Sequence, residues 1–373
     1  MKSPVAWLRR LAEETYTPPF PQYLPSNAVH YAAIASRRAI LWRRLRRWLW
    51  LVVMGQTGLE RSRIVPEDRR ILWIHAGMPQ IGDSLMDLAC RGLLQGREVD
   101  LLIDAHLVPL YAHDDLFRHV GSDAAEAARR DYDLVIVLGV SAQNLRAKMR
   151  HFKRLPWVSL HRYYTSTEFH RTLFAYYRLD QLLGGAADED AVPRPLRPHM
   201  LVGADTAAAV DALALPKRFL VVVVGGVSVS RTYTRWAAVV AAIRARGLHE
   251  PIVILGSANG RGQRDEIMAA SANAPLIDAV DRYSLPEVYE IVRRSSLVVC
   301  TDGGLLHIAN AAEVPTVSLF NERIDPSFRL TTVNRSIALY IATAVSDIAP
   351  EAVADAVLEA WRQPPESVSV RRL

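Results

Sequence analysis

The sequence predicts an α/β protein built from two doubly wound domains. From residue 70 onward, short apolar runs that end in glycine alternate with segments of helical periodicity. The 373 residues are too many for one ordinary core and suit two domains of roughly 150 residues with an extension. A stretch rich in Gly, Pro and acidic residues, 184–198, separates two such series. We therefore expect an N-terminal extension over 1–69, a first domain over 70–198 and a second over 199–373.

The first series contains apolar runs that are typical of buried parallel strands at 71–77, 99–103, 134–140 and 157–160. Helical spacing over 83–94 and 144–152 lies between these runs. Strands that alternate with helices of this length predict right-handed crossovers and a parallel sheet.

The second series repeats the pattern with apolar runs at 219–226, 251–256, 296–304 and 316–320. Helices are expected around 236–246 and over 349–361. Ligands of doubly wound sheets bind at the carboxyl ends of the strands. The loops after Ile74, Val224, Leu255 and Val299 are therefore expected to face a cleft between the two domains.

The composition excludes several classes of protein. Two cysteines, Cys90 and Cys300, exclude a disulfide framework and a four-cysteine zinc site, and they favour a reducing compartment. The chain contains no His/Cys cluster with zinc spacing, no P-loop and no Gly-x-Gly-x-x-Gly fingerprint. Asp131 and Asp133 precede a strand, whereas a metal site would follow one. We therefore expect no metal and no bound cofactor.

The formal net charge of +6 is unevenly distributed. Residues 1–70 hold 13 of the 45 Lys and Arg but only 5 of the 39 Asp and Glu, so the rest of the chain is close to neutral. Four of the eight tryptophans also lie there: Trp7, Trp42, Trp48 and Trp50. Because the globular body carries no basic excess, nucleic acid is not an expected partner.

Residues 37–55, RRAILWRRLRRWLWLVVMG, form the most basic segment. On a helix this spacing gives a basic face and an apolar face edged with tryptophan, which suits the surface of an anionic bilayer. The uncharged run 48–59 is too short and too rich in glycine to span a membrane. The alternative is a helix that docks on the globular body through its tryptophans, and the composition does not separate the two.

The segment 295–320 combines several features of a ligand site. An apolar strand leads into Thr301-Asp302-Gly303-Gly304, and a helix follows with His307 in its first turns. Two glycines at such a turn let backbone approach a ligand, and the unpaired amides at the helix start favour a phosphate. Asp302 has a simpler alternative role as the helix cap, and His307 has one as a core residue.

The spacing of Asp302, Gly304, His307, Ala309 and Ala311, followed by VPTVSLF, resembles the signature of glycosyltransferase family 9, the ADP-heptose:lipopolysaccharide heptosyltransferases. ILWIHAGMPQIGD at 71–83 resembles the opening strand and Ile-Gly-Asp loop of that family. The similarity extends in order over roughly residues 70–345. It implies the GT-B fold, with two Rossmann-like domains, and a donor bound mainly by the second domain.

The resemblance also implies roles for individual residues. Asp83 matches the catalytic aspartate, a general base that takes the proton of the acceptor hydroxyl; its alternative role is a helix cap. The donor would be held by the turn around Asp302, Gly303, Gly304 and His307, by the strand end at Gly225 and Gly226, and at its ribose by Glu266 or the neighbouring Asp265. Where the family has a lysine, this chain offers Arg231 or Arg235, which are otherwise ordinary surface arginines.

Two departures from the family pattern fall near the expected donor pocket. Gly303 stands where Ser or Thr is usual, and Asn321-Glu322-Arg323 replaces Gly-Pro-Thr. These changes leave the identity of the nucleotide sugar open.

The expected function is an inverting, metal-independent transfer of a heptose or related sugar. The donor would be a nucleotide-diphosphate sugar such as ADP-heptose, and the acceptor a lipid-linked saccharide of the lipopolysaccharide-core type. The expected location is cytoplasmic, peripheral on the inner face of the bacterial inner membrane. The alternative is a membrane-peripheral, catalytically weak subunit that binds sugar or assists assembly. A nicotinamide-dependent dehydrogenase comes third, because the fingerprint is missing.

Overall fold

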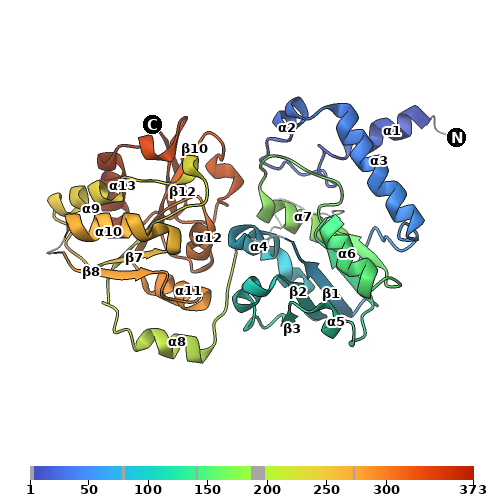
Figure 1. Ribbon diagram of the computed structural model, residues 1–373, viewed down its shortest axis with the longest axis horizontal. Coiled ribbons are helices and arrows are strands. Elements are labelled where there is room, and N and C mark those ends of the chain that lie inside the picture. The colour runs from blue at the N-terminus through green and yellow to red at the C-terminus, as the bar shows by residue number, and fades with distance from the viewer. Residues whose placement is uncertain (1–3, 78–79, 140–141, 186–197, 272–273) are drawn as a thin grey trace. The chain divides into compact units, whose positions relative to one another are not determined.

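The computed structural model describes residues 4–77, 80–139, 142–185, 198–271 and 274–373 (Figure 1). The chain divides into two compact units, Met1–Leu196 and Arg197–Leu373. Each unit contains one parallel sheet, of five strands in the first and seven in the second. The predicted α/β class is therefore confirmed, while most of the stretch 184–198 lies outside the described residues.

The first unit has the strand order β3-β2-β1-β4-β5. Its strands are β1 (Arg70–His75), β2 (Glu98–Ile103), β3 (Phe117–Gly121), β4 (Leu134–Val137) and β5 (Trp157–Ser159). The chain runs from β1 outward to β3 and then returns to place β4 on the free side of β1, with Ile71 opposite both Val99 and Leu134. This reversal makes the carboxyl ends of β1 and β4 the switch point, where doubly wound sheets bind ligands.

Helices of the first unit after the extension are α4 (Ile81–Asp87), η1 (Ala89–Leu94), η2 (Ala105–Leu110), α5 (Ala124–Ala127), α6 (Ala142–His151) and α7 (Arg171–Leu183). Leu145 and Met149 of α6 pack with Leu72, Ile74 and Val135 in one apolar cluster. Because side chains alternate along a strand, these residues share one face of the sheet. The elements α4, η1 and α7 pack against one another.

The helix expected over 83–94 is interrupted. The α-helix ends at Asp87 and a 3₁₀ segment follows from Ala89. The buried Arg91 guanidinium donates from Nη1 to the carbonyl of Leu88 at 2.9 Å and pairs with Asp114. The Arg91 side chain therefore bonds to a carbonyl that would accept a backbone N–H in a continuous α-helix.

The residues before the first sheet form α1 (Pro4–Glu13), α2 (Ala28–Ile34) and α3 (Arg37–Val53). Arg44 of α3 pairs with Glu14 at 2.8 Å and lies 4.0 Å from the ring centroid of Tyr163. Leu51 belongs to the apolar cluster of the sheet, so α3 is packed on the first unit. No helix among the described residues combines the length and apolar character needed to cross a membrane.

The second unit has the strand order β12-β11-β10-β9-β6-β7-β8. Its strands are β6 (Leu220–Val223), β7 (Ile252–Gly256), β8 (Leu276–Val280), β9 (Leu297–Thr301), β10 (Thr316–Asn321), β11 (Ser336–Ile341) and β12 (Val368–Arg372). The chain runs from β6 outward to β8, and β9 then returns to the other side of β6. The switch point of this unit therefore lies at the carboxyl ends of β6 and β9.

Helical elements of the second unit are α8 (Ala204–Asp211), η4 (Val229–Arg231), α9 (Trp236–Ala245), η5 (Ala258–Gly260), α10 (Arg261–Ala270), α11 (Leu285–Arg294), α12 (Gly304–Ala311), η6 (Pro326–Phe328), η7 (Val345–Asp347) and α13 (Pro350–Arg362). Trp236 of α9 and Val353 of α13 pack with Val222 and Val299 of the sheet in one buried cluster. This rigid core carries the loops at the switch point.

Candidate active site

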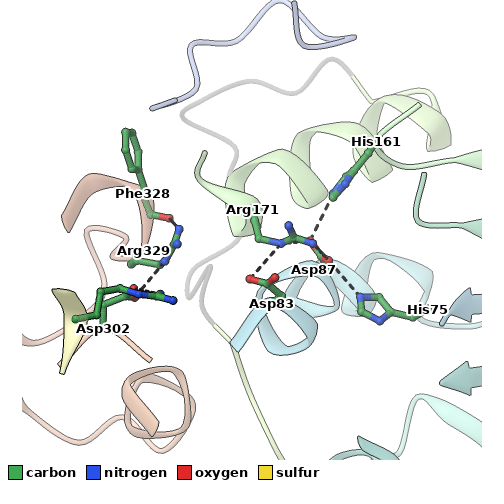
Figure 2. Close-up of polar contacts among 9 residues, drawn as sticks. His75, Asp83, Asp87, His161, Arg171, Asp302, Phe328 and Arg329 are labelled. Carbon is green, nitrogen blue, oxygen red and sulfur yellow. Dashed lines mark hydrogen bonds and ion pairs between the residues drawn. The ribbon is translucent and has the colours of Figure 1, made fainter. Parts of the chain in front are cut away.

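In the second unit, two loops at the switch point meet through an ion pair. The loop after β6 carries Arg231, and the loop after β9 carries Asp302. Nη1 of Arg231 lies 3.0 Å from Oδ2 of Asp302. The same carboxylate accepts a hydrogen bond at Oδ1 from Nε of Arg329 at 3.1 Å; Arg329 lies in the segment after η6 (Figure 2). We call these three residues the Asp302 cluster.

The Asp302 carboxylate is buried and ionised. Burial alone would raise its pKa, but Arg329, His307 and Arg231 together hold the pKa below the usual value. Arg329 is 7% exposed and balances the charge of this carboxylate. Arg231 keeps 35% of its side chain exposed, so part of its guanidinium remains open to a ligand such as phosphate.

The helix α12 begins directly beside this cluster. Its N-cap is Gly303, with an extended backbone (φ 178°), and its first helical residue is Gly304. The capping role considered for Asp302 is therefore wrong. His307 lies one turn in and is 2% exposed. A Cβ on Gly303 would meet only the Thr301 carbonyl at 4.0 Å, so packing does not require glycine where the family has Ser or Thr.

The loop that carries Arg231 is fixed at its start by two glycines. Gly225 has φ +86°, and a Cβ there would lie 2.5 Å from Oδ1 of Asn259. Its N–H donates to Oε1 of Gln263 at 2.8 Å, and the Gly226 carbonyl accepts from Asn259 at 2.8 Å. The two glycines therefore position the loop, and their side-chain-free backbone is what allows this close approach.

Two other residues expected at the donor site lie apart from the Asp302 cluster. Arg235 is exposed at the start of α9, and within the described residues it makes no ion pair. Glu266 is exposed on α10, and no contact joins it to the cluster in the part of the chain that the structure describes. The neighbouring Asp265 pairs with Arg264 at 2.7 Å. Of the two arginines considered, the geometry brings Arg231 to the site.

Arg329 was not anticipated from the sequence. It lies 27 residues from Asp302, beyond a 3₁₀ turn, and no local motif marks it. The unusual segment that begins at Asn321 gives a partial signal. The buried Asn321 side chain donates to the carbonyl of Ser230 at 2.8 Å and so supports the Arg231 loop, while Glu322 and Arg323 are exposed.

In the first unit, the helix that follows β1 presents two carboxylates one turn apart, Asp83 and Asp87. The N-cap of this helix is Gln80, so the capping role considered for Asp83 is wrong. Asp87 is completely buried, whereas the Asp83 side chain is 29% exposed. Of the two, Asp83 is the carboxylate that a substrate can reach.

Asp87 is surrounded by side-chain nitrogen atoms. Arg171, the first residue of α7, donates from Nε and Nη2 to its two oxygens at 3.1 and 2.5 Å. Nε2 of His75 lies 3.2 Å from Oδ2, and Nε2 of His161 lies 3.5 Å from Oδ1. Figure 2 shows these side chains converging on Asp87, with Asp83 at the edge beside Arg171. We call Asp87, Arg171, His75, His161 and Asp83 the Asp87 cluster.

The charges of this cluster follow from burial and pairing. Burial alone would raise the pKa of Asp87, but Arg171 and the two histidines hold it well below the usual value. Burial also lowers the pKa of His161, which therefore stays neutral near pH 7. Within the described residues, no group of three or more His, Cys, Asp or Glu is arranged to hold a metal ion.

The sequence pointed to Asp83 as a candidate but not to the residues that surround it. The spacing of Asp83 and Asp87 places both on one helix face and was a usable signal. His75, His161 and Arg171 come from β1, from the loop after β5 and from the start of α7. Only the tertiary structure brings these three positions together.

Comparison with known proteins identifies the pattern in the second unit. Residues 195–350 match the sequence model of glycosyltransferase family 9 (heptosyltransferase). None of the curated proteins compared with the chain matches it.

Solved structures show the fold of about four fifths of the chain. A family 9 glycosyltransferase from Veillonella parvula is similar with a TM-score of 0.65 and 17% identity, covering 81% of this chain and 100% of the other. The ADP-heptose lipopolysaccharide heptosyltransferase II of Escherichia coli is similar with a TM-score of 0.62 and 18% identity, covering 79% of this chain and 99% of the other. The E. coli heptosyltransferase WaaC, solved with ADP, has a TM-score of 0.55 and 13% identity, covering 79% of this chain and 99% of the other.

The expected GT-B-like fold is thus confirmed, because the matches extend over nearly the full length of these solved chains. The catalytic and donor-binding roles of single residues are not tested by this likeness. The match over residues 195–350, on a chain with the heptosyltransferase fold, confirms the resemblance to glycosyltransferase family 9.

Proposed function

We propose that this chain is a family 9 glycosyltransferase, inverting and metal-independent, that moves a heptose or related sugar from a nucleoside diphosphate donor to a lipid-linked saccharide. The second unit would hold the donor, and the first would supply the base. The observation that carries this proposal is the Asp302 cluster, because it places two guanidiniums on one carboxylate beside a helix N-terminus.

The donor diphosphate would bind to the exposed part of Arg231 and to the amides of Gly303 and Gly304. Helix amides and a guanidinium both favour phosphate oxygens. As the bond between sugar and phosphate breaks, negative charge grows on the leaving diphosphate, and these fixed donors stabilise it. Arg231 would thus take the part of the lysine that the family uses.

The base would be Asp83. It would accept the proton of the acceptor hydroxyl while the oxygen attacks the anomeric carbon, and a single displacement of this kind inverts the anomer. Asp87 is unsuited to this part, since it is buried and bound by Arg171.

ADP is the nucleotide that we propose for the donor. WaaC of E. coli has been solved with ADP and with ADP-2-deoxy-2-fluoro heptose. The match over residues 195–350 covers the Asp302 cluster of this chain. Glu266 and Arg235 are weaker candidates for donor contacts, because they lie exposed and apart from that cluster.

Transfer to a lipopolysaccharide inner-core acceptor tests the proposal, with a panel of nucleotide sugars that includes ADP-heptose. We expect Asp83→Asn to lower kcat by roughly 10² to 10⁴ while ADP affinity is retained. NMR of the product should show the inverted anomer, and EDTA should leave the rate unchanged. Transfer that survives Asp83→Asn contradicts the assignment of the base. ADP binding without transfer to any acceptor would favour the alternative, a catalytically weak binding or assembly subunit.

We further propose that the first unit binds the surface of an anionic membrane, on the cytoplasmic face of the bacterial inner membrane, through the outer side of α3. Ile40, Arg44 and Leu51 bury the inner side of this helix. Trp42, Leu49 and Val53 are exposed at 66%, 54% and 74%, among exposed arginines. Half of the large apolar side chains that the described structure exposes lie within residues 23–53. Docking on the body and membrane contact thus use opposite sides of one helix.

Vesicle binding tests the membrane proposal. Because Leu51 and Gln56 belong to the packing of the first unit, point variants are preferable to deletion of the extension. The triple variant Trp42→Ser, Leu49→Ser, Val53→Ser should lose binding to phosphatidylglycerol vesicles. The control is Val227→Ser, Val229→Ser in the second unit, where the side chains are 97% and 91% exposed. Equal binding by both variants would refute the proposal.

A further inference from the structure

The two carboxylates of α4 have different environments, and Arg171 connects them. Both of its contacts to Asp87 come from the same guanidinium edge, Nε and Nη2, which fixes the plane of the group. The same Nε lies 3.7 Å from Oδ1 of Asp83. Arg171 is 13% exposed and lies against Phe169, with 5.4 Å between the guanidinium and the ring centroid. The guanidinium is therefore held in one place, next to the proposed base.

We propose that Arg171 is a positioning residue for glycosyl transfer: held by Asp87, it orients the Asp83 carboxylate and places a fixed positive charge beside it. This inference rests on the function proposed above. As the acceptor oxygen bonds to the anomeric carbon, the bond to the diphosphate breaks and its electron pair leaves with the nucleotide. The proton goes to Asp83, while Arg171 stays charged because Asp87 still balances it.

The other groups around the pair do not replace Arg171. On α4 itself the neighbour is Asp87, and His75 and His161 face Asp87 from β1 and from the loop after β5. Further titratable groups packed nearby are Glu168, Cys90, Tyr111 and the ion pair of Arg91 with Asp114. In the part of the chain that the structure describes, Arg171 is the guanidinium within ion-pair distance of Asp83.

The pH dependence of kcat/KM separates positioning from mere support of the fold. In Arg171→Met the Asp83 carboxylate loses its neighbouring cation. The acidic limb of the pH profile of kcat/KM should therefore move to higher pH by about one unit. We also expect kcat to fall by roughly 10² because the base is no longer oriented. Arg171→Lys retains the charge, so its acidic limb should remain near that of the wild type, with partial recovery of kcat.

Arg178→Met is the matched control. Arg178 lies on the same helix and is buried, but it donates to the Ser159 carbonyl and to Gln181 and not to either carboxylate. Its loss should lower the melting temperature without moving the acidic limb. Asp87→Asn combined with Arg171→Met removes the cation without leaving a buried anion unpaired. If the single variant folds poorly, this double variant should still show the loss of kcat, because Asp83 is no longer oriented.

A readout that needs no turnover tests the inference directly. Carboxyl ¹³C NMR of the protein, with the Asp83 signal assigned through Asp83→Asn, should show its titration midpoint at higher pH in Arg171→Met than in the wild type. Two results would overturn the role of Arg171: an unchanged midpoint of the Asp83 signal in Arg171→Met, or an acidic limb of the kcat/KM profile that moves equally in Arg178→Met. Absence of transfer by the wild type would instead contradict the proposed function, and the NMR result would still decide this inference.

Discussion

The two units use the same construction, a buried aspartate that anchors arginine at the switch point of a parallel sheet, but with opposite charge. In the Asp87 cluster one guanidinium meets two carboxylates, so the cluster carries a formal charge of −1 when its histidines are neutral. In the Asp302 cluster two guanidiniums meet one carboxylate, which leaves a formal charge of +1. A surplus carboxylate suits proton transfer, and a surplus guanidinium suits phosphate.

The largest effect is expected from removing the anchor of the first unit. Asp87→Ala leaves Arg171 buried with only the more distant Asp83 for balance. We expect a loss of roughly 3–5 kcal/mol in the free energy of unfolding, measured in urea. Asp87→Ala with Arg171→Met should recover part of that loss, because the unpaired charge is gone. An equal loss in both variants would show that pairing is not what Asp87 provides.

In the second unit, the next largest effect is expected from Arg329→Met. It removes one of the two guanidiniums and the charge surplus, so ADP affinity should fall about 10- to 100-fold by titration calorimetry. Arg293→Met removes a half-exposed arginine of the same unit, paired with Glu290, and should leave ADP affinity unchanged. Arg171→Met should also leave it unchanged. If Arg329→Met binds ADP as the wild type does, the positive cluster is not the phosphate site.

The pH dependence of stability should also distinguish the clusters. The folded state keeps the pKa of His161 below its unfolded value of about 6.5. As the pH falls below that value, the unfolded chain gains a proton first, so stability decreases by at most about 1.4 kcal/mol per pH unit. The pKa values of Asp87 and Asp302 are lowered in the folded state, so their ionised forms stabilise the fold above about pH 4. This stabilisation is lost in stronger acid, where the carboxylates become protonated.

His161→Phe isolates that histidine. The ring packs at 4.9 Å from Phe174 and 5.5 Å from Phe169, so phenylalanine suits the site. The variant should show a smaller decrease in the free energy of unfolding between pH 7 and 5.5 than the wild type. Parallel curves for the two proteins would mean that another group controls this range.

The smallest effect is expected at the loop that carries Arg231. Gly225→Ala combines positive φ with a Cβ contact at 2.5 Å, whereas Gly247→Ala has a similar φ of +87° and open space. Both should lose about 1 kcal/mol of stability from backbone strain, and Gly225→Ala should lose more because its Cβ also meets Asn259. Only Gly225→Ala should also weaken ADP binding, by a few-fold, as Arg231 moves. Equal ADP affinities would show that the loop tolerates the change.

Much of the fold was predictable because buried parallel strands are continuous apolar runs. The runs at β1, β2, β4, β6, β7, β9 and β10 are apolar in sequence and central in the sheets. By contrast, β3 (FRHVG) and β12 (VSVRR) are edge strands with polar residues, and their sequences give little strand signal. Their pairing comes from neighbouring strands and not from local pattern.

The site was predictable where one motif holds it and unpredictable where distant segments meet. Asp302, Gly303 and His307 lie within one strand–turn–helix unit, so their proximity follows from the sequence. Arg329 and Arg171 reach their aspartates across 27 and 84 residues. An arginine that is neither in a motif nor in a recognisable pattern cannot be told from a surface arginine until the chain is folded.

The two free cysteines lie close to these aspartates. Cys90 is three residues after Asp87, with Sγ 3.6 Å from its carbonyl, and Cys300 is two residues before Asp302. Both are buried, and burial raises the pKa of both thiols. A thiol-reactive dye can therefore modify each one only after its surroundings open. Each unit of the natural chain thus contains one cysteine whose labelling reports local opening. Mass spectrometry of the two labelled peptides would measure the opening rate near each cluster separately.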